Sequence, residues 1–122
     1  MVTALMIQPG RHPCITQLCA DGLYLNYAVS KECDTLCCAS MFALEKNVAV
    51  VYAADGVFYG MKPNRRIGKR IITGTFYIVK VTDGTLCSLT EKEIVEYSLR
   101  FRERELWSDT EAIDAMFNEL ES

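Results

Sequence analysis

Residues 61–80, MKPNRRIGKRIITGTFYIVK, place a strongly basic run directly before a run of β-branched and aromatic residues. The second part, from Arg70 to Val81, alternates in hydrophobicity and is rich in strand-forming residues, which favours one long β-strand. Gly74 interrupts this strand, and a glycine there marks a bulge or the close approach of another segment. The stretch therefore predicts a sheet in the middle of the chain.

Four other segments are expected to be strands. The first ends at Pro9-Gly10, a pair that stops strand pairing and forms a turn. The third and fourth are separated by the short polar interval 45–47, which suits a hairpin, and Asp55-Gly56 indicates a second hairpin because this pair accepts the positive φ angles of tight turns. The four segments are residues 3–10, 14–19, 35–44 and 47–54.

Helical periodicity is clearest in the last third of the chain. Thr90 followed by Glu93 has the pattern of a capping box, which satisfies two backbone N–H groups at the start of a helix. Ile94, Tyr97 and Phe101 then recur at helical spacing. A second amphipathic helix is expected over residues 108–121, where acidic residues in the first turn precede an apolar stripe. The stripe consists of Ile113, Met116, Phe117 and Leu120.

A shorter helix is expected near residues 21–30. The Asp21 carboxylate can cap it, and Leu23, Tyr27 and Tyr24 then fall on one side. The same residues are good strand formers, so a strand remains an alternative.

These elements predict an α+β fold in a single domain, residues 1–122. A sheet with an apolar face needs a cover, and helices with one apolar stripe need a surface to cover. We therefore expect an antiparallel meander sheet covered on one side by the two C-terminal amphipathic helices. Half of the 122 residues are apolar, which is sufficient for one core of this size.

Six cysteines are many for a chain of this length. The amino terminus has neither the basic start nor the long apolar stretch of a signal peptide, so we expect a cytoplasmic protein with reduced thiols, most of them packed in the core. A zinc site is a second interpretation, but no CxxC pair supports it. Its ligands would be His12 and Cys14 with Cys33 and either Cys37 or Cys38.

Sequence motifs of catalysis are missing from the chain. It has no GxxxxGK[ST] phosphate loop, no HExxH and no GxSxG, and its one histidine lies in an expected turn. The longest apolar stretch is too short to cross a bilayer. We therefore expect no enzyme activity, no bound cofactor, no metal and no membrane contact.

Charge is distributed unevenly along the chain. The net charge is −3, yet residues 62–70 carry five positive charges and no acid, whereas the residues from Glu91 onward carry ten acids and four bases. A cationic segment of this kind can contact phosphates or an acidic protein surface, or it can be a solvated loop that the acidic tail neutralises. Phe58, Tyr59, Phe76 and Tyr77 flank the segment and could stack on nucleic-acid bases.

The candidate binding residues are those of this segment, interpreted as a basic loop. They are Lys62, Asn64, Arg65, Arg66, Lys69 and Arg70. Within it, Pro63-Asn64-Arg65 favours a structural turn that Arg65 pins by reaching a carboxylate or a carbonyl, and a ligand contact is the alternative. Trp107 is expected to be buried as a wedge between the two C-terminal helices.

Four short motifs, in this order, carry a resemblance to a known family. They are Pro9-Gly10, Pro63-Asn64-Arg65, Gly74-Thr75-Phe76 and Ser88-Leu89-Thr90. Over residues 4–104 the chain resembles the domain of unknown function numbered 3846, found in small proteins of phages, plasmids and conjugative elements. The cysteine-rich first half and the additional helix over residues 108–121 depart from the pattern. The resemblance implies a gene of a mobile element and supplies no catalytic residues.

The sequence thus predicts a non-catalytic binding protein of a mobile element. Its partner would be a host or element macromolecule with an acidic surface, in an accessory role such as counter-defence, and the basic loop would bind it. A nucleic-acid-associated protein that contacts the phosphate backbone is the alternative, and a zinc-stabilised domain is a third. The sequence leaves the oligomeric state open.

Overall fold

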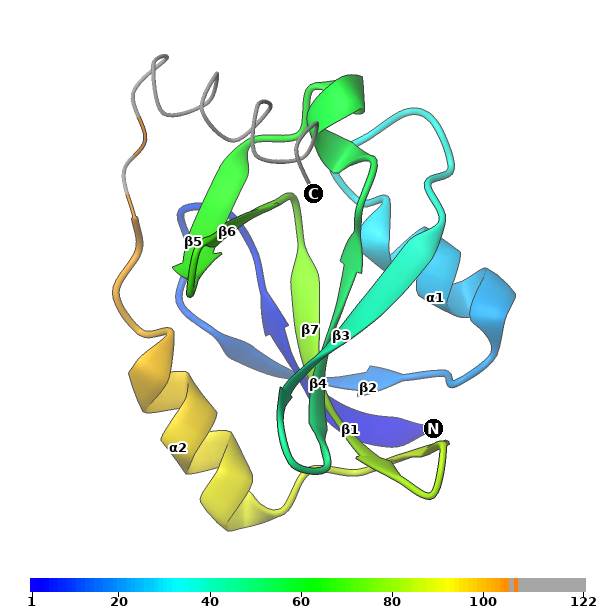
Figure 1. Ribbon diagram of the computed structural model, residues 1–122, viewed down its shortest axis with the longest axis vertical. Helices are drawn as coiled ribbons and strands as arrows, with labels where there is room; N and C mark the ends of the chain where they lie inside the picture. Colours follow the sequence, from blue (N-terminus) through cyan, green and yellow to red (C-terminus); the bar gives the residue numbers. More distant parts are fainter. Residues whose placement is uncertain (106, 108–122) are drawn as a thin grey trace.

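The computed structural model describes residues 1–105 and 107, which form an antiparallel sheet, a separate two-stranded hairpin and two α-helices (Figure 1). The strands of the main sheet follow the order β2-β1-β7-β4-β3, and β8 pairs with the distal half of β7. These strands are β1 (Val2–Ile7), β2 (Cys14–Leu18), β3 (Ala39–Glu45), β4 (Val48–Ala53), β7 (Phe76–Thr82) and β8 (Thr85–Cys87). The predicted α+β class and antiparallel sheet are confirmed.

Strand β7 occupies the centre of the sheet, so the predicted meander is wrong. Antiparallel pairing joins β7 to β1 on one side and to β4 on the other. Its first four residues, Phe76 to Val79, are all buried because elements cover both faces of the sheet at this point. In a strand buried on both faces, consecutive residues are apolar, whereas in a strand buried on one face apolar and polar residues alternate. This is why the sequence FYIV belongs at the centre.

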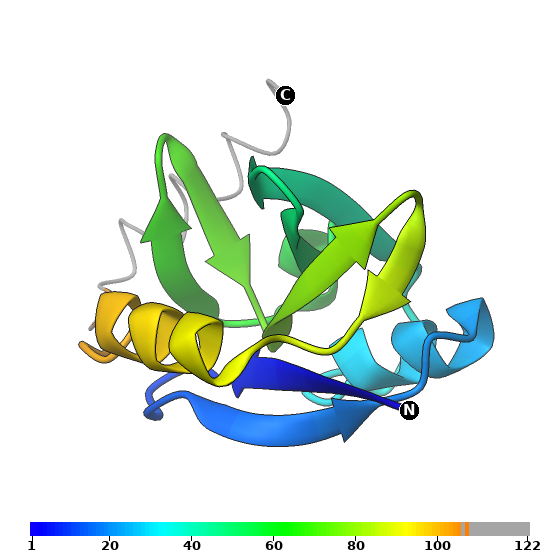
Figure 2. The ribbon, with the colours of Figure 1, turned by 90° about the horizontal axis from the view of Figure 1, so that it is seen from below.

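The two helices lie on opposite faces of the sheet, which corrects the expectation that helices cover one side only. Helix α2 (Glu91–Arg100) packs with the hairpin against one face, where Tyr97 and Phe101 join the core. Helix α1 (Gly22–Val29) covers the other face through Leu25 and Val29. Figure 2 shows the two helices from below, on opposite sides of the molecule.

Helix α1 begins as predicted but points a different side inward. The Asp21 carboxylate accepts a hydrogen bond from the Leu23 N–H at 2.9 Å and caps the helix. The predicted apolar side, which contains Leu23, Tyr24 and Tyr27, is exposed. The buried side contains Leu25 and Val29, which join the core on that face of the sheet.

Gly74 divides the predicted long strand into two. Strand β6 (Arg70–Thr73) belongs to the hairpin, and β7 starts at Phe76. Gly74 has a φ of +73°, a conformation that favours glycine, and its N–H donates to the Lys62 carbonyl at 2.8 Å. The predicted close approach is confirmed. The predicted second hairpin at Asp55-Gly56 is wrong, since a short 3-10 helix, η1 (Gly56–Tyr59), follows β4 instead.

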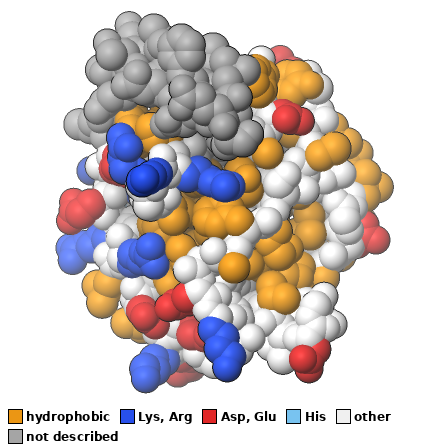
Figure 3. All heavy atoms as spheres, viewed as in Figure 1, with side chains coloured by type: hydrophobic (Ala, Val, Ile, Leu, Met, Phe, Trp, Pro, Cys, Tyr) orange, Lys and Arg blue, Asp and Glu red, His pale blue; other side chains and the backbone are white. Residues whose placement is uncertain are grey.

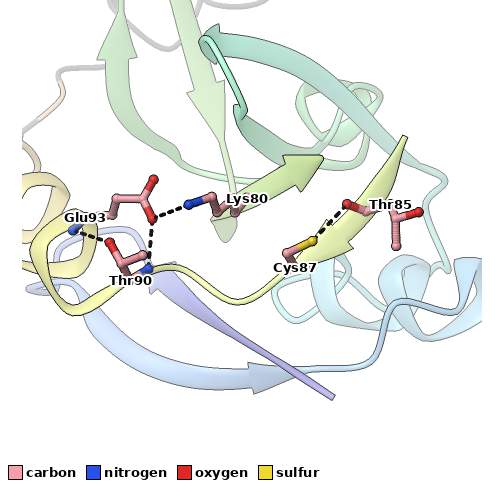
Figure 4. Close-up of polar contacts among 5 residues, drawn as sticks. All are labelled: Lys80, Thr85, Cys87, Thr90 and Glu93. Carbon is pink, nitrogen blue, oxygen red and sulfur yellow. Dashed lines mark hydrogen bonds and ion pairs between the residues drawn. The ribbon is translucent and has the colours of Figure 1, made fainter. Parts of the chain in front are cut away.

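Helix α2 starts with the predicted capping box, and one ion pair joins it to the sheet (Figure 4). The Glu93 carboxylate accepts hydrogen bonds from the Thr90 N–H at 2.8 Å and from Lys80 Nζ at 3.2 Å, and Thr90 Oγ1 accepts one from the Glu93 N–H. The Thr90 backbone donor, together with Lys80, lowers the pKa of Glu93. The same side chain therefore caps α2 and fastens it to β7.

Replacing Glu93 with glutamine should lower the free energy of unfolding at neutral pH by about 1 kcal/mol, because the ion pair and the charge at the helix start are both lost. A carboxyl group with a lowered folded pKa stabilises the fold above its unfolded pKa, and this stabilisation is lost as the pH falls below about 4.3. The difference between wild type and Glu93→Gln should therefore shrink in acid. Denaturant unfolding of both proteins at neutral pH and in acid measures this difference in the free energy of unfolding. Glu96→Gln, an exposed change on the same helix, should have little effect at either pH.

The predicted helix over residues 108–121 lies outside the described residues. Among the helices that the structure describes, none has the length and apolar character needed to span a membrane.

Candidate binding surface

The basic segment forms a β-hairpin rather than the predicted loop. Strand β5 (Pro63–Ile67) pairs with β6 in an antiparallel register that brings Ile67 opposite Arg70. Residues 68 and 69 make the turn, and Gly68 has a φ of +61° there. Ile67 and Ile72 are buried in the core next to the main sheet. Their burial holds the hairpin against the sheet on the side of α2 (Figure 2).

Asn64 and Arg65 point inward, so two of the six predicted binding residues cannot reach a partner in the folded protein. Asn64 is 0 % exposed and Arg65 is 2 % exposed. Regular pairing would send consecutive side chains to opposite sides, but the register shifts between Pro63 and Arg65. Such a bulge disturbs the alternation and lets both side chains turn toward the core.

The Asn64 amide joins three segments of the chain. Its Nδ2 donates to the Ile7 carbonyl at 2.9 Å and to the Gly74 carbonyl at 2.8 Å, and its Oδ1 accepts from Arg65 Nη1 at 2.7 Å. These carbonyls belong to the end of β1 and to the connection between β6 and β7. Asn64 therefore fastens the hairpin to the two central strands.

The Arg65 guanidinium is satisfied by backbone carbonyls. Nη2 donates to the Arg11 carbonyl at 2.7 Å and to the Phe101 carbonyl at 3.1 Å, and Nε donates to the same Phe101 oxygen at 3.3 Å. Burial lowers the pKa of Arg65, and the nearby Glu105 carboxylate opposes that effect. The interpretation that Arg65 pins the structure through a carbonyl is confirmed, although it does so from a strand and not from a turn.

Arg70 is half-buried and held by two rings. Its Nη1 donates to the Tyr52 hydroxyl at 2.6 Å, and its guanidinium carbon lies 4.4 Å from the centre of the Phe42 ring. A guanidinium over an aromatic face is attracted to it and loses part of its freedom to reach a ligand. Arg70 thus joins the hairpin to β3 and β4.

The remaining predicted cations, Lys62, Arg66 and Lys69, are exposed. We call these three residues the cationic hairpin face. Among residues 1–105 and 107, no carboxylate forms an ion pair with any of their side chains. Figure 3 shows Lys and Arg side chains gathered on this part of the molecule, next to hydrophobic side chains. The positive charges of the cationic hairpin face therefore point into solvent.

Arg66 contacts two residues that follow α2, Glu105 and Trp107. Its backbone N–H donates to Glu105 Oε2 at 2.6 Å, and its guanidinium carbon lies 5.7 Å from the centre of the Trp107 ring. Trp107 Nε1 in turn donates to the Asn64 carbonyl at 3.1 Å. The Trp107 indole therefore packs beside the hairpin. Its predicted place between two helices involves residues outside the described part of the chain.

Three further arginines lie next to the hairpin and were not predicted. Arg65 binds the carbonyls of Arg11 and Phe101, which brings the turn after β1 and the residues after α2 to the same place. Arg11, Arg102 and Arg104 are exposed there. No signal in the sequence could have placed them, because these segments meet the hairpin only through tertiary contacts.

The four aromatic residues that flank the segment divide into two pairs. Phe58 and Tyr59, in η1, are exposed, whereas Phe76 and Tyr77, in β7, are buried. The Tyr77 hydroxyl donates to the Ala28 carbonyl at 3.0 Å, and burial raises its pKa. Of these four rings, those of Phe58 and Tyr59 are therefore accessible to a partner.

The cysteines are mostly outside the core, contrary to expectation. Of the six, all within the described residues, Cys37 alone is buried. Cys33 and Cys37 flank Thr35, whose N–H donates to Cys33 Sγ at 3.3 Å and whose carbonyl accepts from Cys37 Sγ at 3.7 Å. Burial raises the pKa of Cys37, and the neighbouring Cys33 acts in the same direction. Cys37 is therefore mainly an uncharged thiol.

The zinc interpretation has no support in the geometry. In the part of the chain that the structure describes, no three His, Cys, Asp or Glu side chains meet where they could hold a metal ion. His12 instead hydrogen-bonds through Nδ1 to the Arg102 carbonyl at 3.0 Å. The imidazole thereby links the turn after β1 to the end of α2.

Comparison with known proteins yields a family and no individual relative. No curated protein matches the chain, and no solved structure matches it. A family model matches residues 2–102, which include the hairpin and all four motifs of the resemblance. The chain belongs to this family, whose description is "Domain of unknown function (DUF3846)".

Proposed function

We propose that this chain is a non-catalytic cytoplasmic protein of a mobile element, and that it binds an acidic surface of a host or element protein through the cationic hairpin face. The observation that carries the proposal is the exposure of Lys62, Arg66 and Lys69, whose side chains have no carboxylate partner among the described residues. Unpaired cations on a rigid hairpin attract an opposite charge and lose little entropy when they bind.

The surroundings of the face favour a protein partner. Phe58 and Tyr59 are exposed in η1, which leads into Lys62. Aromatic residues and arginine are enriched in protein interfaces, where rings supply contact area and cations supply orientation. Arg65 and Arg70 do not face the partner. Their internal contacts hold the hairpin rigidly, and a rigid hairpin suits such an interface.

The proposed site can be tested by removing its charge. A variant with Lys62→Ala, Arg66→Ala and Lys69→Ala should lose a partner that immobilised wild-type protein recovers from host lysate. The control carries Lys31→Ala, Lys46→Ala and Lys92→Ala, three exposed cations elsewhere on the surface, so both variants lose three positive charges. The control should recover the partner as wild type does.

Equal recovery by the hairpin variant would remove the cationic hairpin face from consideration. Loss of the partner in both variants would show that overall charge matters and that the position of the charge does not. The recovered partner should also bind less tightly as salt is added, because contacts between exposed charges are screened.

Binding to a phosphate backbone is the alternative, and the exposed Arg11, Arg102 and Arg104 beside the cationic hairpin face are the observation that favours it. The cationic hairpin face and these three arginines together supply six exposed cations. They can neutralise about six phosphates, so the slope of log K against log salt should not exceed about 5 in magnitude. Labelled single-stranded and duplex nucleic acid at low salt test this. Lack of binding by either one would end the alternative without affecting the protein-binding proposal.

A further inference from the structure

Strand β3 forms one edge of the main sheet, and within the described part of the chain no element pairs with its outer side. A free edge presents unpaired N–H and C=O groups that can extend the sheet with another strand, and natural proteins usually block such an edge with lysine, proline or a very short strand. Strand β3 is seven residues long, and its first six residues, ASMFAL, contain neither a charge nor a proline.

The side chains of β3 are open to a partner as well. Met41 is 46 % exposed, and a groove of about 440 Å³ runs beside it, lined in part by Phe42 and Ala43. The Ala39 N–H donates to Asn26 Oδ1 of α1 at 2.7 Å, which places α1 next to β3 (Figure 1).

The regular part of β3 ends before Glu45. Pairing with β4 is continuous from Ala39 to Ala43 and then shifts between Ala43 and Glu45. These five residues can continue regular pairing at the outer edge, with Met41 in the middle, except that the Ala39 N–H already donates to Asn26 Oδ1. The one charged residue of the strand, Glu45, lies beyond them.

We propose that the chain forms a two-fold dimer in which β3 pairs with β3 of a second copy in antiparallel fashion, centred on Met41. In this register Met41 faces Met41 of the second copy, and Ala39 faces Ala43, so the long side chains lie between small ones. No like charges oppose each other. A two-fold interface needs a surface that complements itself, and this strand meets that condition.

Pairing β3 with β3 of a second copy fits better than pairing β3 with β2, the strand at the other edge of the sheet. Strand β2, at that edge, has Thr16 and Gln17 in its five residues, and pairing β3 to β2 would build an open chain of copies rather than a closed pair. An antiparallel pair of β3 strands closes after two copies. It also brings both α1 helices to the same face of the joined sheet.

The experiment measures the mass of the full chain by sedimentation at several concentrations. Wild type should be a dimer that dissociates on dilution. Met41→Lys should be a monomer, because two ammonium groups would face each other across the two-fold axis. Ile15→Lys makes the same change on β2, where Ile15 is 60 % exposed, and should remain a dimer. Circular dichroism of both variants checks that the fold is intact.

A mixture of two variants makes the test specific to the register. Met41→Glu alone should also be a monomer, but Met41→Glu mixed with Met41→Lys should form a heterodimer through opposite charges. A wild-type chain that is monomeric at every concentration overturns the proposal. It is likewise overturned if Met41→Lys dimerises as wild type does, if Ile15→Lys is the variant that loses the dimer, or if the mixture stays monomeric.

Discussion

Arg65→Ala should lower the free energy of unfolding by about 3–5 kcal/mol, because it leaves several buried acceptors without a donor. The substitution removes every donor that the guanidinium supplies to the carbonyls of Arg11 and Phe101 and to the amide of Asn64. The contacts with Phe101 and Asn64 are buried and the one with Arg11 is part-buried, so most of these acceptors lose their donor where water has little access. Chemical denaturation followed by circular dichroism measures the loss.

Two further variants separate this role from a general effect of charge. Lys69→Ala removes an exposed cation at the hairpin turn and should change the stability by no more than about 0.5 kcal/mol. Arg65→Lys keeps the charge but lacks the planar fork of donors, so it should recover only a small part of the loss. If Arg65→Ala is within about 1 kcal/mol of wild type, the carbonyl contacts contribute little to the stability of the fold.

Gly74→Ala should lower the free energy of unfolding by about 2–4 kcal/mol through two separate effects. Gly74 has a φ of +73°, where an L-residue is strained, and a Cβ added there would lie 2.5 Å from Met61 Sδ. Met61 is itself buried, so its side chain cannot simply move aside. Thermal and denaturant unfolding of the variant measure the cost.

Gly84→Ala is the matched control for the backbone effect. Gly84 has a φ of +75°, nearly the same as Gly74, but no atom lies within 4 Å of an added Cβ. Its cost should therefore be the backbone strain alone, about 1–2 kcal/mol. The excess at Gly74 measures the contact with Met61. Equal costs at the two glycines would mean that the core around Met61 accommodates the added methyl group.

The motifs that carry the family resemblance serve the architecture of this chain. Asn64 joins β5 to the carbonyls of Ile7 and Gly74, and Thr75 binds the Glu32 carboxylate through both its N–H and its hydroxyl. Ser88 Oγ accepts from the Thr3 N–H at 2.9 Å, where the chain leaves β8 for α2. These motif residues therefore hold elements of the fold together, and the proposed partner depends on residues around the motifs.

Local chemistry was sufficient to predict several elements. The Asp21 cap, the turn at Pro9-Gly10 and the capping box at Thr90 and Glu93 depend on residues a few positions apart, and all three form as expected. The order of the strands could not be predicted this way. Whether β7 pairs with β1 or only with its neighbours in sequence depends on which arrangement buries both of its faces.

At the candidate site, too, one part could be predicted from the local sequence and the other part depended on tertiary contacts. The sequence by itself determined that residues 62–70 carry five positive charges in the middle of the chain. Only the tertiary structure decided which of them face solvent. Arg65 turns inward because its acceptors, the carbonyls of Arg11 and Phe101, are 54 and 36 positions away and meet it only in the folded chain. A buried guanidinium requires such acceptors, and nothing in the neighbouring sequence indicates where they will lie.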